Sequence, residues 1–402
     1  MVVLTFFWMN QPRTYGDETF FVKWLTVIKR TILDIDEKPP YKDYLFIDAS
    51  ESKAILPLTS DTSRSAIITD RKKLTEVFNF LHQNQNDFRY IVCDILFDQP
   101  SILDSGLENS IQKLGDKFLG VNELQEDSIL NPIIKVPHAS SSLFVHQGTI
   151  VKYPIFLKDN LKTLPSEMYE KLEGVKLENR SPVVWIEKKG LSVGSPILEM
   201  AIREIDFKKE SEQDSAYVKI GLGEIVSLIR LLKNNPIASQ KIFDQYFRNR
   251  IIMIGDFVSD QHSTVYGDLS GTLSILNAYL TLKSGKNIIG IGLLLFLLFG
   301  FGIISYTLFI DKTIRIRGFA LKIFEHKHGF LRFFYYYGIA LTIMMVIAYY
   351  VFGIHIGILF LLVYLKAIDW IYNKRYIEWW EDVKVRYKKF VKFFNPKKQI
   401  AP

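Results

Sequence analysis

The sequence predicts an α/β extracytoplasmic domain, with a mostly parallel sheet flanked by helices, followed by an α-helical transmembrane region of three spans. Three observations lead to this class. Strand-like and helix-like runs alternate through residues 44–286, as in parallel α/β sheets. Long charge-free apolar runs lie within residues 287–372, and the basic residues are concentrated toward that same end of the chain.

The strands are expected where short apolar runs occur, at 44–47, 90–97, near 183–187 and at 251–255. The run 90–97 contains the single cysteine, Cys93, which we interpret as a small buried hydrophobe. Residues 137–165 are less periodic and are expected to be β-rich or looped. Helices are expected from about residue 70, along a stripe of Leu107, Ile111, Leu114 and Phe118, after a Ser195 cap with Pro196 at the first position, and at 222–232, 237–247 and 273–282.

Two uncharged runs predict the membrane region. Residues 287–310 are long enough to cross the roughly 30 Å hydrocarbon layer once. Residues 333–365 are too many for one ordinary span, and we place a turn at Gly353 between spans near 332–352 and 355–372. The alternative is a single long kinked helix, which would leave two spans.

The charge distribution predicts the orientation in the membrane. Residues 287–402 hold 16 basic and 6 acidic side chains, whereas residues 1–286 hold 34 basic and 37 acidic. Because basic loops stay in the cytoplasm, three spans place 311–332 and the tail inside and 44–286 outside. The predicted location is the cytoplasmic (inner) membrane of a bacterium, with the lipid bilayer as a partner. A nucleic-acid partner is not expected, because the positive charge is absent from the folded domain.

The two ends of the chain each have an expected role. Residues 1–9 (MVVLTFFWM) are apolar but too short to span, so one interpretation of the N-terminal segment 1–43 is that it holds the end of a transmembrane helix that begins upstream. The tail 373–402 has an apolar stripe and clustered lysines, typical of a basic amphipathic helix on the inner leaflet. A docking helix for a cytoplasmic partner is the alternative for this tail.

Three segments carry a resemblance to a known family: YLFIDAS at 44–50, YIVCDILFDQP at 90–100, and 247–285. Together they resemble the CHASE domain, type 2, an extracellular sensory domain found beside bacterial cyclases and histidine kinases. The resemblance implies a sensory role, and three closely spaced spans after the domain. It covers about 44–372, but the usual cytoplasmic output domain is missing. The motif residues that match are Ile254, Gly255, Asp260, Thr264, Gly271, Asn277 and Ala278.

Acidic residues gather where the predicted parallel strands end, which is where open α/β sheets bind ligands. We predict a ligand site there, and these groups also suit a divalent cation, although no cofactor is predicted. The alternative is that the Asp side chains cap helices or turns and that Asn277 satisfies a buried backbone group. The predicted ligand-binding residues are Asp48, Asp94, Asp98, Asp256, Asp260 and His262.

The chain lacks the GxSxG, HExxH, Walker and GxGxxG patterns, so no enzyme activity is predicted. The leading hypothesis is a membrane-bound sensor or adaptor that binds an extracytoplasmic ligand or protein and signals to a separate cytoplasmic output protein. The alternative is a structural subunit of a bacterial envelope complex, in which the domain serves only as an interaction surface.

Overall fold

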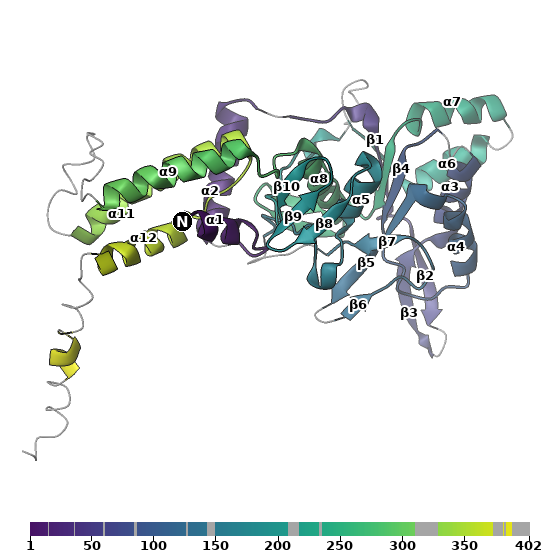
Figure 1. Cartoon of the computed structure of the whole chain (residues 1–402). Helices are drawn as coiled ribbons and strands as arrows, with labels where there is room; N and C mark the ends of the chain where they lie inside the picture. The colour runs from purple at the N-terminus through teal and green to yellow at the C-terminus, as the bar shows by residue number, and fades with distance from the viewer. Residues whose placement is uncertain are drawn as a thin grey trace, which may run out of the picture. The chain divides into compact units, whose positions relative to one another are not determined.

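The computed structural model describes residues 1–14, 16–35, 37–58, 61–83, 87–125, 128–142, 149–207, 217–232, 235–309, 329–372, 381 and 383–387. The chain forms two compact units (Figure 1). The larger comprises Met9–Gly290 and Phe352–His355. The smaller comprises Met1–Trp8, Ile291–Val351 and Ile356–Pro402, so it contains the predicted spans.

A mostly parallel sheet of seven strands is the centre of the larger unit (Figure 1). Its order is β11-β1-β12-β4-β5-β6, and β7 also pairs with β5. Every pairing is parallel except that of β6 with β5, which confirms the predicted α/β class. The strands are β1 (Tyr44–Asp48), β4 (Tyr90–Asp94), β5 (Phe118–Gln125), β6 (Ser128–Leu130), β7 (His138–Ser140), β11 (Val218–Gly221) and β12 (Ile251–Gly255).

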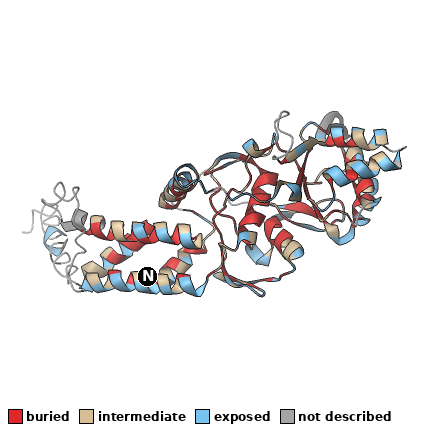
Figure 2. Cartoon of the chain, turned by 90° about the horizontal axis from the view of Figure 1, so that it is seen from above, coloured by how far each residue is buried: buried red, intermediate tan, exposed pale blue. Residues whose placement is uncertain are grey.

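Helices cover both faces of this sheet, which explains why its central strands are apolar on both sides (Figure 2). On one face, Leu45, Ile47 and Cys93 pack with α3 (Arg71–Gln83), α4 (Asp104–Gln112), α6 (Leu222–Leu232) and α7 (Pro236–Tyr246). On the other face, Tyr44 and Phe46 pack with α5 (Leu164–Glu173) and α8 (Gly271–Ser284). Cys93 is buried, as predicted, and burial raises the pKa of its thiol.

Three smaller sheets complete the larger unit. Strands β8 (Leu177–Arg180), β9 (Val183–Ile186) and β10 (Gly190–Val193) form an antiparallel sheet. Two hairpins, β2 (Lys53–Leu58) with β3 (Asp61–Thr69) and β13 (Gln261–Thr264) with β14 (Gly267–Ser270), connect parts of the main fold. The less periodic stretch 137–165 holds β7, isolated bridges and the start of α5.

Three sequence predictions about secondary structure are wrong in whole or in part. No helix follows Ser195, because Ile197 bridges Lys152 and the segment pairs with it as extended chain. Phe118 begins β5 instead of extending the α4 stripe, since the chain turns at Gly115, which has a φ of +59°. The strand expected over 90–97 ends at Asp94, and Phe97 instead bonds through its carbonyl to the Ile133 N–H.

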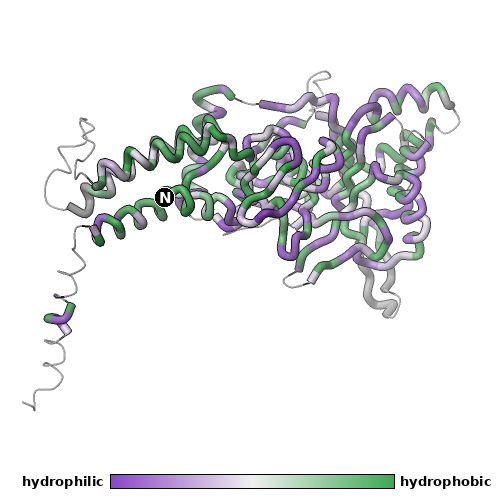
Figure 3. Tube along the Cα trace, in the orientation of Figure 1, coloured by the Kyte–Doolittle hydropathy of each residue, from purple (hydrophilic) through white to green (hydrophobic). Residues whose placement is uncertain are grey.

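The smaller unit is helical and apolar, as its hydropathy colouring shows (Figure 3). It holds α9 (Ile291–Phe309), α11 (Gly329–Phe352), α12 (Ile358–Tyr372) and most of α1 (Val2–Met9). By length and composition, Ile291–Phe309 and Tyr335–Phe352 can cross a membrane. Helix α12 matches the third predicted span in position, but its 15 residues rise only about 22 Å. Among the described residues the structure thus shows two membrane-length helices, and the three-span count stays a prediction.

The turn between the last two helices has the predicted glycine. Gly353 has a φ of +68°, and a Cβ at this position would lie 2.6 Å from the Lys286 Cβ. Both the backbone angle and the space therefore require glycine. The predicted basic segment 311–332 is described only from residue 329 onward, and the predicted tail 373–402 lies outside the described residues except for 381 and 383–387.

Candidate functional site

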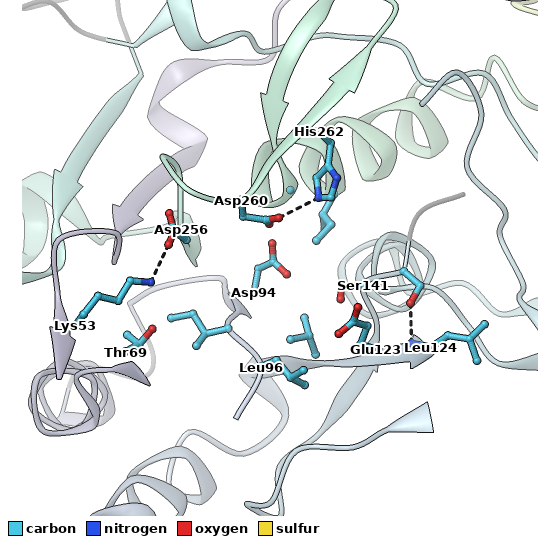
Figure 4. Close-up of a pocket in the computed structure, with 15 residues that line it drawn as sticks. Lys53, Thr69, Asp94, Leu96, Glu123, Leu124, Ser141, Asp256, Asp260 and His262 are labelled. Atoms are coloured by element: carbon cyan, nitrogen blue, oxygen red, sulfur yellow. Dashed lines mark hydrogen bonds and ion pairs between the residues drawn. The ribbon is translucent and has the colours of Figure 1, made fainter. Parts of the chain in front are cut away.

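A cavity of about 450 Å³ lies at the edge of the main sheet where β4 and β12 end (Figure 4). Its wall combines charged groups from distant parts of the chain with an apolar side that includes Ile95, Leu96 and Ile275. Parallel α/β sheets present their binding crevices at this edge, as the sequence analysis expected. The charged residues that line it are Lys53, Asp94, Glu123, Asp256, Asp260 and His262.

Asp260 and His262 form a hydrogen-bonded pair beside Gly271, at the N-terminus of α8. The Asp260 Oδ1 lies 3.0 Å from the His262 Nε2 (Figure 4). This hydrogen bond, together with the charges of Asp260 and Asp94, raises the pKa of His262 against the opposing effect of burial. A Cβ at Gly271 would overlap the Asp260 carboxylate and would lie 3.3 Å from the His262 Nε2. Gly271 therefore makes the space that this pair occupies.

Asp94 points toward Asp260 from the end of β4 (Figure 4). Its Oδ2 accepts a hydrogen bond from the Thr272 hydroxyl at 2.9 Å. Burial and the Asp260 charge raise the pKa of Asp94 to about 7, although Thr272 and His262 act in the opposite direction. Near neutral pH this carboxyl is thus poised between its neutral and ionised forms, which lets it act as a hydrogen-bond donor or as an anion.

Lys53 and Asp256 form a second charged pair at the cavity, with 2.7 Å between the Lys53 Nζ and the Asp256 Oδ2. The other Asp256 oxygen accepts the N–H groups of Val258 and Ser259. Burial opposes ionisation of Asp256, but these hydrogen bonds outweigh it and lower its pKa. Asp256 is therefore both a turn residue and a fixed negative charge beside the cavity.

Two predicted ligand residues do not line this cavity. Asp48 accepts the N–H groups of Ser50 and Phe257 and so ties together the loops after β1 and β12. Asp98 lies in a neighbouring depression of about 510 Å³ that shares Lys53 with the cavity. For Asp48 the structure favours the alternative role predicted for these residues, namely satisfying a turn.

The predicted motif residues have structural roles next to the site. A Cβ at Gly255 would overlap the Thr272 hydroxyl, so glycine there lets α8 approach β12 closely. Thr264 closes the β13–β14 turn by donating to the Gly267 carbonyl at 2.7 Å. Asn277 is fully buried, accepts the Ala201 and Ile202 N–H groups and donates to the Ile202 and Leu273 carbonyls.

Sequence reasoning missed several polar groups of the cavity. Lys53 and Thr69 come from the β2–β3 hairpin, and Glu123 and Ser141 come from β5 and the loop after β7. None of these lies in a recognisable motif, and Lys53 is 203 residues from its partner Asp256. Thr272, which bonds to Asp94 beside the cavity, was also missed, although it directly follows the motif residue Gly271.

Within the described ranges, no group of three or more His, Cys, Asp or Glu side chains is arranged to hold a metal ion. In the Asp260–His262 pair and in the Lys53–Asp256 pair, each carboxylate already has a hydrogen-bonding partner. The geometry of the described residues therefore does not support a divalent cation at this place.

Comparisons of the chain with protein-family models, with curated proteins and with solved structures give no match. The chemistry of the cavity therefore rests on its own side chains, four of them carboxylates against one lysine and one histidine.

Proposed function

We propose that this protein is a sensor or adaptor of the cytoplasmic membrane, whose larger unit binds an extracytoplasmic ligand or protein and passes the change through the membrane helices. A separate cytoplasmic protein would receive the signal at the basic segments 311–332 and 373–402. The proposal includes three spans, with α12 as the last, because three spans put both basic segments on the same side. The resemblance to the CHASE domain, type 2, supports the same role.

One observation carries this proposal: α8 joins the cavity to the first membrane-length helix. Gly271 and Ile275, in its first turns, line the cavity. Every residue from Gly271 to Leu282 is buried, so the helix is held as a rod on the sheet. Residues 285–290 then lead directly into α9. A ligand that displaces Asp260 or His262 would press on the start of α8, and the rod would carry that displacement to its other end.

The cavity favours a ligand with positive charge. Four carboxylates line a space that also has an apolar wall, and Lys53 is held by Asp256. An amine or guanidinium on a short carbon skeleton would bond to Asp260, Asp94 and Glu123 and cover the apolar wall. A partner protein could supply the same group as a lysine or arginine side chain.

A ligand screen on the full chain in lipid nanodiscs tests the proposal. Small amines, basic amino acids and uncharged metabolites of similar size are added, and the thermal unfolding temperature is measured. We expect amines to raise this temperature for the unchanged chain and not for the Asp260→Asn variant. Asp98→Asn is the control, since it also removes a carboxylate but Asp98 lies in the neighbouring depression and does not line the cavity. If no compound or copurifying protein stabilises the unchanged chain, sensing at this cavity is excluded.

One feature favours the second candidate, a structural subunit of an envelope complex. The β2–β3 hairpin pairs Ile55 with Ile67, and both side chains are more than two-thirds exposed, at 72% and 71%. A cross-strand pair of exposed isoleucines is suited to contact another protein. Copurification that is lost with Ile55→Lys but unaffected by Asp260→Asn would support this second function over sensing.

A further inference from the structure

Helix α2 (Gly16–Val27) has an exposed apolar face. Phe20, Trp24 and Val27 follow one another at steps of four and three residues, so they lie along one side of the helix. Their exposed fractions are 56%, 55% and 45%, which is high for side chains of this size. Lys23 is exposed between them. A phenylalanine and a tryptophan side by side in water are unfavourable unless something covers them.

The opposite face of α2 is held by the larger unit. Val22 and Leu25 are buried, and the Glu18 side chain is also buried. Glu18 forms an ion pair with Lys152, which itself is only 3% exposed. Burial opposes ionisation of Glu18, but Lys152 and His355 outweigh it and lower its pKa to about 2. Helix α2 is therefore fixed in the larger unit by one face while its other face remains apolar.

A contact within the larger unit places α2 close to the turn between α11 and α12. His355, in that turn, has its Nδ1 3.6 Å from the Glu18 Oε1. The Phe21 and His355 rings lie 6.4 Å apart between centroids. The turn directly follows Phe352, where the membrane-length segment Tyr335–Phe352 ends. A chain that leaves the hydrocarbon layer at Phe352 brings its next residues to the membrane surface, and α2 lies beside them.

We propose that α2 is an interfacial helix, whose Phe20–Trp24–Val27 face lies in the headgroup region of the outer leaflet. Aromatic side chains are preferred at this depth, where the ring is partly dehydrated and the indole N–H reaches water or lipid oxygens. Lys23 would reach the lipid phosphates from the same face. The occupant of the face is thus lipid, and the helix would hold the larger unit against the membrane. This inference rests on the membrane location given under the proposed function.

Site-directed spin labelling in nanodiscs tests the proposal. The only native cysteine, Cys93, is buried, so a label reacts at an introduced cysteine. Labels are placed at Phe20→Cys and Trp24→Cys, with Lys23→Cys as a substitute if either variant unfolds at a lower temperature. Collision rates with oxygen, which enters lipid, and with a water-soluble nickel chelate are then compared. Ile237→Cys on α7 is the aqueous control, and Phe299→Cys on α9 is the membrane control, since both native side chains are exposed, at 85% and 74%.

We expect the oxygen-to-nickel ratio at positions 20 and 24 to be clearly higher than at 237 and lower than at 299, because the headgroup region is shallower than the middle of α9. Ratios at 20 and 24 equal to that at 237 would overturn the proposal. Labels immobilised and shielded from both reagents would also overturn it, because a protein would then cover the face. If the ratio at position 299 equals that at 237, the proposed membrane location itself is wrong. That outcome is distinguishable from one in which only the interfacial position of α2 is wrong.

Discussion

Replacing Asp94 with asparagine tests whether the cavity holds a carboxyl that resists ionisation. Asparagine keeps an oxygen that can accept the Thr272 hydroxyl and has nearly the same volume. It removes the charge that burial and Asp260 disfavour. The substitution therefore isolates the energetic consequence of ionising Asp94.

The expected magnitude follows from the pKa. The folded-state pKa of Asp94 is about 7, above its ordinary value of 3.8, so the folded chain binds more protons than the unfolded chain between these limits. The free energy of unfolding of the unchanged protein falls as pH rises through that window. A difference of about three pH units corresponds to about 4 kcal/mol. The Asp94→Asn variant lacks this loss, so its advantage should be small near pH 4 and approach about 4 kcal/mol at pH 8.

The assay is thermal unfolding of the full chain in nanodiscs from pH 4.5 to 8, followed by tryptophan fluorescence. For a domain of this size, about 4 kcal/mol corresponds to an increase of roughly 8 °C in the unfolding temperature. The Asp256→Asn control should instead be less stable than the unchanged protein by a nearly constant amount over this range, because hydrogen bonds lower the pKa of Asp256 below 3.8 and it stays ionised throughout. A constant difference between Asp94→Asn and the unchanged protein across the pH range would refute the reasoning.

Three further substitutions test how the site and the helix α2 are held. Gly271→Ala should displace the Asp260 carboxylate and abolish ligand-induced stabilisation. The control Gly106→Ala, in open space on α4, should leave stability unchanged or raise it by up to about 1 kcal/mol. Ligand binding and thermal unfolding of both variants check this. Asn277→Leu should lower the free energy of unfolding by at least about 3 kcal/mol, since it leaves two buried N–H groups and a carbonyl without their hydrogen-bond partner. A loss below about 1 kcal/mol in thermal unfolding would contradict this. Glu18→Gln should destabilise the fold by about 3–5 kcal/mol at neutral pH, because it leaves Lys152 without its charged buried partner. This difference in stability should be complete above about pH 4.5 and disappear as pH falls toward 2. Equal unfolding temperatures of the variant and the unchanged protein at pH 7 would contradict it.

Short-range sequence patterns correctly predicted the central strands and the amphipathic helix α3. The apolar runs at 44–47 and 251–255 become central strands, and the stripe starting near residue 70 becomes α3, because a buried strand or an amphipathic helix shows its periodicity within a few residues. The Ser195–Pro196 helix signal failed for the opposite reason. A cap residue and a proline favour a helix start, but pairing with Val151–Tyr153, more than 40 residues away, satisfies the same backbone groups as extended chain.

The comparison of Asp48 with Asp94 shows why the sequence alone could not predict which carboxylates line the cavity. Both end parallel strands, and the register places them at one level, since Gly255 of β12 is opposite Asp48 on one side and Asp94 on the other. Sequence position therefore gave the two residues equal standing. Only Asp94 lines the cavity, because α8 brings Thr272 and Gly271 to that side of β12. Asp48 instead satisfies two loop N–H groups.

The sequence by itself determined the parallel α/β class, two of the three predicted spans as membrane-length helices, and the sheet edge at which polar groups collect. These depend on composition and short-range periodicity, which one chain displays directly. The tertiary structure decided which carboxylates share a cavity, that Lys53 meets Asp256, and that helix α2 lies beside the turn at His355. Each of these requires residues separated by 80 or more positions to meet, and long-range packing, which no local pattern encodes, brings them together.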